Sequence, residues 1–222
     1  MMRSLAGALA LTGVVTLGAR SDPVPGLRQA AHGTSQTPAP SQATAVFAGG
    51  CFWGIEGVFE HVKGVTAATA GYAGGAVASP SYEQVSTGTT GHAESVRVTY
   101  DPSQVTYERL LEVFFTVAHD PTQRNRQGPD HGTQYRSVVF YGDTAQRRAA
   151  EAYVAELTRK QAFSTPIVTE IVPLTAFYEA EEYHQHYMAR HPHSLYIVYN
   201  DAPKVKALRV AFPALYREPP KD

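Results

Sequence analysis

Apolar runs separated by glycine, proline and polar residues divide the chain from residue 44 onward into strand-like and helix-like segments. The run 44–48 is apolar, partly β-branched and stopped by two glycines, which predicts a buried strand. Runs of the same character predict strands at 65–72, 93–100, 137–141, 167–174 and 195–199.

Apolar residues spaced by three and four predict helices between these strands. The stripe begins at Phe52, continues through Ile55, Val58 and Phe59, and indicates a helix that ends near Gly64. Comparable patterns predict helices at 107–117, from an Asp143 cap to about 161, at 179–189, and after Pro203. Helices interspersed irregularly among strands indicate an α+β domain with a mixed sheet.

Two long segments, 71–92 and 120–136, are rich in glycine and polar residues and predict surface loops. Loops of this length are usually functional or disordered, and the tyrosines within both of them argue for function.

Charge and composition exclude two classes of partner. Nineteen basic residues balance twenty acidic ones in 222 residues, and the basic residues are not clustered, so we expect no nucleic-acid binding. The uncharged run 4–19 is shorter than the roughly 20 residues that a membrane span needs. We therefore expect no stable membrane span.

The amino-terminal run has the makeup of a signal peptide, with Arg3 before an Ala- and Leu-rich core. We predict a signal peptide at 1–19, a disordered Pro/Ser/Thr/Ala-rich linker at 20–43 and a catalytic domain at 44–217. Export to the periplasm or the medium follows; the alternative is a buried first helix in a cytoplasmic protein.

Cys51 is the only cysteine, and it lies between Gly50 and the aromatic pair Phe52-Trp53. A lone thiol is either buried packing or a reagent, and an exported protein has little use for an unreactive one. At the junction of a strand and a helix, the helix dipole should lower the thiol pKa below about 8.5. The flanking glycines should admit a second molecule.

Glu94 falls on the face of its predicted strand that carries Val96 and Val98, so it is either a buried acid or a solvated strand end. Burial would raise its pKa and keep it protonated near neutral pH. Tyr82 and Tyr135, in the two long loops, could hydrogen-bond a substrate oxygen.

Histidines do not indicate a metal centre. His184 and His186 are two residues apart, which places them on different sides of a helix, so we expect packing roles, no metal and no cofactor. Phe52 and Trp53, being adjacent, cannot both face the core, and part of the pair should line the mouth of a site.

Six motifs in order resemble one known family, the type A peptide methionine sulfoxide reductases. They are Gly50-Cys51-Phe52-Trp53-Gly54, Gly71-Tyr72 with Gly74-Gly75, Gly91-His92-Ala93-Glu94, His119-Asp120-Pro121, the run 126–137 and Glu182-Tyr183-His184-Gln185. The resemblance spans most of 44–201 and implies a two-layer α/β plait with long functional loops.

The resemblance also implies roles for seven residues. Cys51 would attack the sulfur of a methionine S-sulfoxide in a protein or as the free amino acid, and would become a sulfenic acid. Glu94 would protonate the departing oxygen, with Tyr82 and Tyr135 hydrogen-bonded to it. Phe52 and Trp53 would hold the S-methyl group, and Asp130 matches an acidic residue of the substrate pocket.

One departure from the family pattern affects the redox cycle. Many relatives carry a second cysteine, at the position of Ser86 or in the carboxy-terminal tail, and this chain has neither. An external thiol, from a thioredoxin-like protein or a small molecule, must then reduce Cys51. Two other hypotheses remain at this stage, a Cys–His acyl-transfer hydrolase and a metal-binding module that uses the nine histidines.

Overall fold

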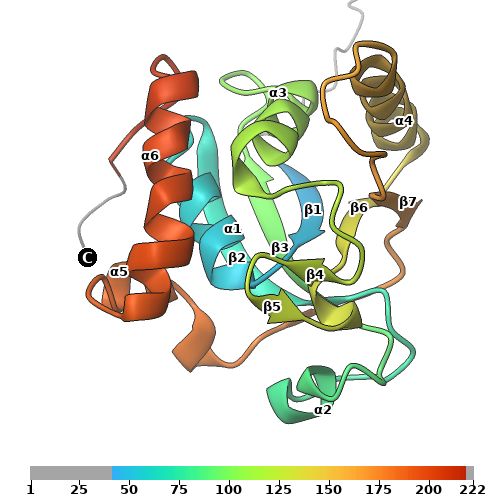
Figure 1. Ribbon diagram of the computed structural model, residues 1–222, viewed down its shortest axis with the longest axis vertical. Helices are drawn as coiled ribbons and strands as arrows, with labels where there is room; N and C mark the ends of the chain where they lie inside the picture. The colour runs from blue at the N-terminus through green and yellow to red at the C-terminus, as the bar shows by residue number, and fades with distance from the viewer. Residues whose placement is uncertain (1–41, 219–222) are drawn as a thin grey trace, which may run out of the picture. The chain divides into compact units, whose positions relative to one another are not determined.

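A six-stranded mixed sheet organises the fold, and the computed structural model describes residues 42–218. The predicted signal peptide and almost all of the predicted linker lie outside the described residues. The strand order is β7-β6-β1-β3-β2-β8 (Figure 1). The strands of this sheet are β1 (Ala43–Gly49), β2 (Val65–Ala73), β3 (Ala93–Tyr100), β6 (Ser137–Tyr141), β7 (Glu170–Pro173) and β8 (Phe177–Glu179).

Strand β1 is central because its side chains are apolar on both faces. Ala45 and Phe47 belong to the main core, whereas Val46 and Ala48 belong to a smaller cluster on the opposite face. Neighbouring strands are antiparallel except for β6 and β7, which are parallel, so the sheet is mixed as predicted.

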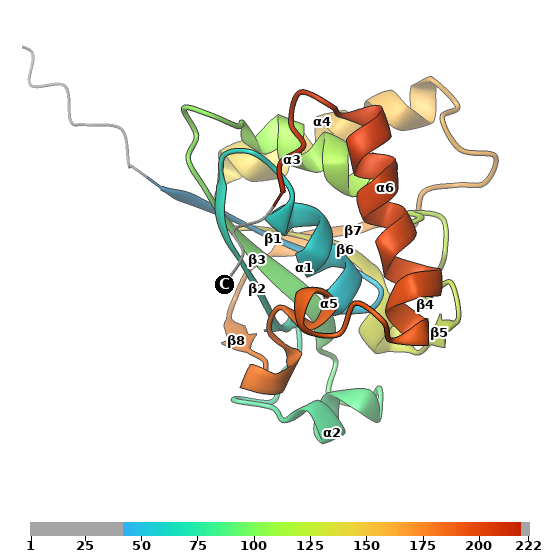
Figure 2. The same ribbon diagram turned by 90° about the vertical axis from the view of Figure 1, so that its left-hand side faces the viewer.

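Most of the helices pack on one face of this sheet, which confirms the two-layer α+β architecture, while the short helix at Tyr82–Ser86 lies beyond the end of the sheet (Figure 2). The helices are α1 (Phe52–Glu60), α2 (Tyr82–Ser86), α3 (Tyr107–Val113), α4 (Thr144–Arg159), α5 (Tyr187–Arg190) and α6 (Ala202–Ala211). Short helical turns lie at Phe114–Ala118, Thr133–Tyr135, Glu182–His184 and Ile197–Asp201. Within 42–218 no helix has the length and apolar character needed to cross a bilayer.

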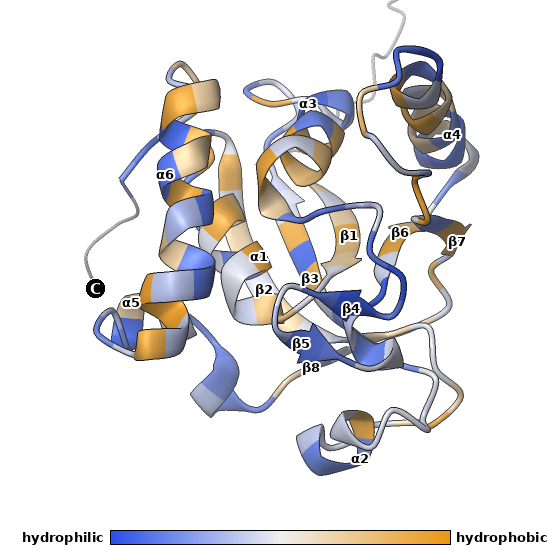
Figure 3. Cartoon of the chain, in the orientation of Figure 1, coloured by the Kyte–Doolittle hydropathy of each residue, from blue (hydrophilic) through white to orange (hydrophobic). Residues whose placement is uncertain are grey.

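Both long loops contain some regular structure. Segment 71–92 begins as the end of β2 and later forms α2, whose first turn is closed by a capping box between Ser81 and Gln84. Segment 120–136 contains the small hairpin β4 (Arg126–Gln127) and β5 (Asp130–His131), which is markedly hydrophilic (Figure 3). The prediction of unbroken loops is wrong at these points, although both segments remain at the surface edge of the sheet.

The predicted strand at 195–199 is wrong, because this run is helical and continues into α6. The Val198 amide donates to the Ser194 carbonyl at 2.9 Å, one helical turn earlier. A short apolar run has no clear period, and here the next residues continue the helix. The predicted strand at 167–174 is shortened to β7.

The predicted helix at 179–189 is also wrong, and the edge of the sheet explains why. Glu179 pairs with Gly71 as the end of β8, and the Gln185 side chain bonds both the amide of Ala70, at 2.9 Å, and its carbonyl, at 3.0 Å. By hydrogen-bonding to this segment, the edge of β2 holds it in an irregular conformation. Only the short turn Glu182–His184 and α5 are helical.

Candidate active site

Chain register brings Cys51 and Glu94 together. Phe47 of β1 pairs with Val96 of the antiparallel β3. Two residues later on β1 and two residues earlier on β3, Glu94 therefore lies at the end of β1, just before Cys51. The residue after Cys51 contacts Glu94 directly, because the Phe52 amide donates to Glu94 Oε2 at 3.1 Å. The start of α1 and the start of β3 thus share one small volume.

Glu94 is a buried acid, 2% exposed, as the first of the two sequence interpretations required. Burial is the main cause that raises its pKa, from 4.5 to about 8, while the bond from the Phe52 amide opposes the shift. The charges of Asp130 and Asp201 raise the pKa further. At neutral pH the carboxyl group therefore carries a proton that it can donate.

The expected low pKa of Cys51 is wrong. Burial raises the pKa of the thiol well above its ordinary value, and Glu94 and Asp201 raise it further when they are charged. The Trp53 amide and the Lys204 ammonium favour the thiolate but are smaller effects. A helix start alone does not outweigh the loss of water around a side chain that is only 8% exposed.

The flanking glycines are needed by the protein itself. A Cβ on Gly50, whose φ is 98°, would lie 2.5 Å from the Gln127 side chain. A Cβ on Gly54 would lie 2.1 Å from Asp201 Oδ1. The expectation that these glycines admit a second molecule is therefore wrong, because Gln127 and Asp201 occupy that space.

Asp201 and Lys204 form a partly buried ion pair against the first turn of α1. Asp201 is fully buried, and its Oδ1 lies 3.0 Å from Lys204 Nζ. Sequence reasoning placed no functional residue here. The signal that could have found it is an acidic residue and a lysine three positions apart, within one turn of a helix whose other face is apolar.

Phe52 and Trp53 divide as their adjacency on a helix requires. Phe52 is buried, while Trp53 is partly buried and lies at the edge of the core. The Trp53 indole N–H donates to His184 Nδ1 at 3.1 Å, and its ring stacks on Tyr187 at 3.7 Å between centroids. His184 also packs against Phe52, at 4.9 Å between ring centroids. His184 thus holds the aromatic pair in place.

Tyr82 and Tyr135 reach this site from the two loop segments. The Tyr82 ring lies 4.5 Å from the His184 ring, and its backbone amide donates to Glu181 Oε1 at 2.9 Å. For both phenols, burial raises the pKa first and the charge of Glu94 second, so they are neutral hydrogen-bond donors. The charge of Cys51 contributes to both shifts in the same direction but is a smaller effect.

Asp130 lies on β5 and accepts a hydrogen bond from the hydroxyl of Tyr196. The Tyr196 ring meets Trp53 edge-on at 5.8 Å between centroids. Sequence reasoning missed Tyr196, because it assigned 195–199 to a strand and gave the site no residue from that run. In the helical conformation Tyr196 joins Asp130 to Phe52 and Trp53, which we call the aromatic wall.

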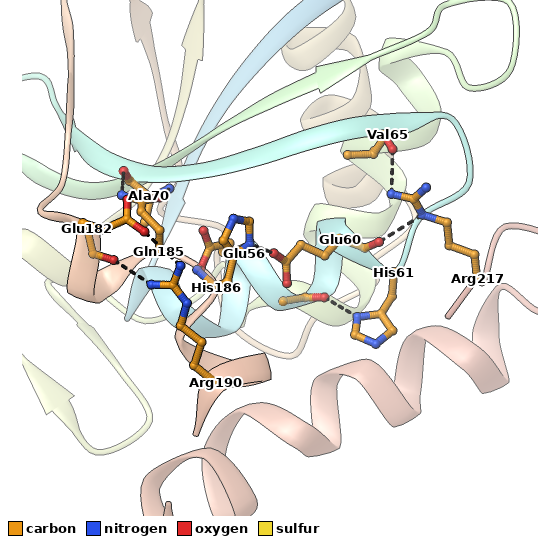
Figure 4. A network of polar contacts seen from close by, with 11 residues as sticks. Glu56, Glu60, His61, Val65, Ala70, Glu182, Gln185, His186, Arg190 and Arg217 are labelled. Atoms are coloured by element: carbon orange, nitrogen blue, oxygen red, sulfur yellow. Dashed lines mark hydrogen bonds and ion pairs between the residues drawn. The ribbon is translucent and has the colours of Figure 1, made fainter. Parts of the chain in front are cut away.

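The two histidines weighed for a metal site, His184 and His186, contact different partners, although not because they lie on one helix. His184 faces Trp53, whereas His186 bonds Glu60 on α1 through its ring and Glu56 through its backbone amide (Figure 4). Glu56, Glu60 and His186 have potential ligand atoms within 4.8 Å of one another. Their hydrogen bonds already join α1 to the segment before α5, so the arrangement is accounted for as a structural clamp.

This geometry places a protonated carboxyl group against the residue that follows a lone thiol, and His184 links the rings of Phe52 and Trp53 to the neutral phenol of Tyr82. Such a set can attack an electrophilic atom, donate a proton to an oxygen and hydrogen-bond that oxygen. A family model described as peptide methionine sulfoxide reductase matches residues 43–214 of the chain. The chain belongs to this family.

Known reductases of the family cover almost the whole described part of the chain. Peptide methionine sulfoxide reductase MsrA 2 of Mesorhizobium japonicum is 56% identical over 182 residues, 82% of this chain and 93% of the relative. MsrA of Natronomonas pharaonis is 52% identical over 170 residues, 77% of this chain and 95% of the relative.

Solved reductase structures share the fold. Mxr1 of Saccharomyces cerevisiae in its reduced form has a TM-score of 0.65 and 36% identity, over 69% of this chain and 88% of the other. Methionine sulfoxide reductase A of Corynebacterium diphtheriae has a TM-score of 0.62 and 37% identity, over 71% of this chain and 78% of the other. The α+β architecture is therefore that of the reductase family.

Proposed function

We propose that the protein reduces methionine S-sulfoxide to methionine, with Cys51 as the nucleophile and Glu94 as the acid. The observation that carries the proposal is the burial of a protonated carboxyl group beside the residue that follows a lone thiol. Membership of the reductase family supports the same activity.

The chemical step transfers one oxygen atom. Glu94 donates its proton to the sulfoxide oxygen while the Cys51 sulfur attacks the sulfoxide sulfur, and the proton of the Cys51 thiol passes to the Glu94 carboxylate. The bond between the methionine sulfur and the oxygen then breaks, methionine leaves, and the oxygen with its proton ends on Cys51 as a sulfenic acid. The thiol supplies the electron pair, so methionine is the reduced product and no further oxidant or reductant is needed in this half-reaction. Tyr82 and Tyr135 stabilise the oxygen by hydrogen bonding while charge develops on it.

Substrate binding uses the aromatic wall and Asp130. Phe52 and Trp53 form an apolar surface for the S-methyl group, and His184 holds Trp53 in its orientation through the indole N–H. Asp130, bonded to Tyr196, lies on the opposite side and supports the second loop. The wall favours a methyl sulfoxide over a charged ligand because its faces are apolar.

The second half-reaction uses an external thiol. Cys51 is the only cysteine in the sequence, so the sulfenic acid condenses with an outside thiol, releases water and forms a mixed disulfide. A second thiol then displaces the mixed disulfide and restores Cys51. A thioredoxin-like protein or a small thiol serves as the reductant.

Stereospecific turnover is the direct test. With dithiothreitol as the reductant, the S epimer of a methionine sulfoxide peptide should be reduced and the R epimer should not. Cys51→Ser should abolish turnover. Equal rates on both epimers, or full activity of Cys51→Ser, would exclude the proposed reaction.

A Cys–His acyl-transfer hydrolase has no comparable support. In residues 42–218 no histidine side chain hydrogen-bonds Cys51: His184 bonds Trp53, and buried His119 bonds the Phe114 carbonyl and Ser137. A dimedone-reactive sulfenic acid that forms on Cys51 after addition of sulfoxide would distinguish the reductase from an acyl enzyme.

We also propose that the protein is exported. The supporting observation is the uncharged Ala- and Leu-rich run after Arg3, followed by a polar linker. Amino-terminal sequencing of protein recovered outside the cytoplasm should show that about the first 19 residues of the predicted signal peptide are missing. An intact amino terminus on cytoplasmic protein would contradict export.

A further inference from the structure

Exposed large apolar side chains gather beside the proposed active site. In residues 42–218 five are exposed: Tyr183, Leu195, Val198, Tyr199 and Val210. All except Val210 lie in segment 183–199, which also carries His184 and Tyr196. Isolated exposed apolar residues are normal, but a cluster beside a functional site indicates a binding surface.

Two groups of these side chains lie next in sequence to residues whose rings contact Trp53. Tyr183 precedes His184, and their ring centroids are 4.2 Å apart. Leu195 precedes Tyr196, while Val198 and Tyr199 follow it within one helical turn. Because Trp53 contacts both His184 and Tyr196, both groups lie within a few side chains of the same indole.

The second group, Leu195, Val198 and Tyr199, is exposed although the residue in its middle is buried. Leu195 is 71% exposed and Tyr199 is 73% exposed, although Ile197, between them, is 1% exposed. The helical turn therefore points one side into the core and leaves an apolar side outward. We call Tyr183, Leu195, Val198 and Tyr199 the apolar rim.

We propose that the apolar rim binds the residues on either side of an oxidised methionine in an extended, apolar stretch of an unfolded protein. The inference rests on the proposed function, because a sulfoxide that reaches Cys51 as part of a polypeptide must leave its flanking residues on the rim of the pocket. The rim adjoins Tyr196 in sequence, and the Tyr196 ring contacts Trp53 of the aromatic wall.

The chemistry of methionine favours this occupant. Methionine is an apolar residue that is buried in folded proteins, so its sequence neighbours are often apolar, and they become accessible when the protein is damaged or unfolded. Leucine and tyrosine side chains offer such neighbours apolar area without requiring a particular sequence. The rim therefore predicts a preference for oxidised methionines whose sequence neighbours are apolar.

Three substrates in the S configuration test the preference, with dithiothreitol as the reductant in every assay. Two are peptides of equal length whose central methionine sulfoxide is flanked by leucine and valine or by serine and glycine. The third is N-acetyl-methionine sulfoxide amide, which has no flanking residues. For the natural sequence, kcat/KM should be about tenfold higher for the apolar peptide than for the polar one, which is the size of effect a few buried side chains produce at interfaces.

The variant Leu195→Ser/Tyr199→Ser should remove most of this preference through KM, while turnover of the amide stays unchanged. Val210→Ser is the matched control, because Val210 is 75% exposed but lies near the far end of α6. It should keep the preference. Circular dichroism and thermal unfolding of all variants separate lost binding from lost folding.

Several outcomes would overturn the inference. These are equal kcat/KM for the two peptides in the natural sequence, a preserved preference in the double variant, or an equal loss in Val210→Ser. A defect of the double variant that appears with a thioredoxin-like reductant and not with dithiothreitol would assign the rim to the reductant instead. Absence of turnover of all three substrates would reject the proposed function itself.

Discussion

Protonation of Glu94 links the buried position of one side chain to catalysis. Its pKa of about 8 arises mainly from burial, so the group is protonated below that pH and charged above it. A charged Glu94 cannot donate a proton, and it also raises the pKa of Cys51. Both effects act in the same direction and oppose activity at high pH.

We expect kcat to fall as the pH rises through about 8, where Glu94 loses its proton. Glu94→Gln can still accept the Phe52 amide bond but cannot donate a catalytic proton, so kcat should fall about a hundredfold or more with little change in KM. The pH–rate profile of the variant should lose the limb near 8. An unchanged rate in Glu94→Gln would remove the acid from its proposed role.

The same shift affects stability in a defined direction. Because the pKa of Glu94 is raised in the folded state from 4.5 to about 8, the folded state holds the proton more tightly than the unfolded state. The free energy of unfolding should therefore decrease as the pH rises from about 4.5 to about 8. In urea titrations this slope should be smaller for Glu94→Gln, and an equal slope would contradict the assigned pKa.

Among the groups that shift the pKa of Cys51, Lys204 is the cation, and it favours the thiolate. Lys204→Met should raise the pKa of the Cys51 thiol and leave Asp201 buried without its partner, at a cost of about 3 kcal/mol of stability. The pH dependence of iodoacetamide labelling and urea unfolding measure the two effects. Lys206→Met, at an exposed lysine of the same helix, is the control.

The double variant Asp201→Asn/Lys204→Met separates charge from packing. With both charges removed, most of the lost stability should return, because no charge is left buried alone. If Lys204→Met is as stable as the natural sequence, the pair does not contribute to the fold in the way its burial indicates.

At the scale of elements, the contact between α1 and α6 sets the position of the nucleophile. Asp201 at the start of α6 fits against Gly54, in the first turn of α1, and the clamp of Glu56, Glu60 and His186 holds the later turns (Figure 4). The first turn of α1 is therefore held by Asp201 as well as by Glu94.

Gly54→Ala should destabilise the protein by about 1–3 kcal/mol, although alanine is the better helix former, because the new methyl group overlaps Asp201. Reductase activity should fall with it, since the displaced turn carries Phe52 and Trp53. Gly142→Ala is the control, because the nearest atom to its added Cβ would be at an ordinary 3.6 Å. Thermal unfolding and turnover measure both, and a neutral Gly54→Ala would show that α6 moves freely.

At the scale of the whole molecule, a lone cysteine dictates the redox cycle. After one turnover with excess sulfoxide, mass spectrometry should find the protein one oxygen heavier, and addition of glutathione should convert it to a mixed disulfide at Cys51. Restoring a second thiol at position 86, with Ser86→Cys, offers a comparison chain in which an internal disulfide becomes possible. A stable oxidised form that no external thiol reduces would contradict the cycle.

Periodicity along the chain determined the elements whose packing is local. Strands at 93–100 and 137–141, the helix that starts at Phe52 and the α4 cap at Asp143 follow from alternation, spacing and a capping residue, and the structure confirms them. Glu94 was found because a carboxylate on an apolar strand face is a conflict that the sequence shows openly. Motif order indicated the family, which the comparisons then showed.

Tertiary structure decided what depends on partners distant in sequence. Segment 179–189 is irregular because the edge of β2 takes its hydrogen bonds, and 195–199 is helical because it continues into α6. The pKa of Cys51 is raised because burial outweighs the helix start. Local periodicity carries no information about which surface removes water from a group, so the sequence led to Cys51 as the proposed nucleophile but not to the ionisation of its thiol.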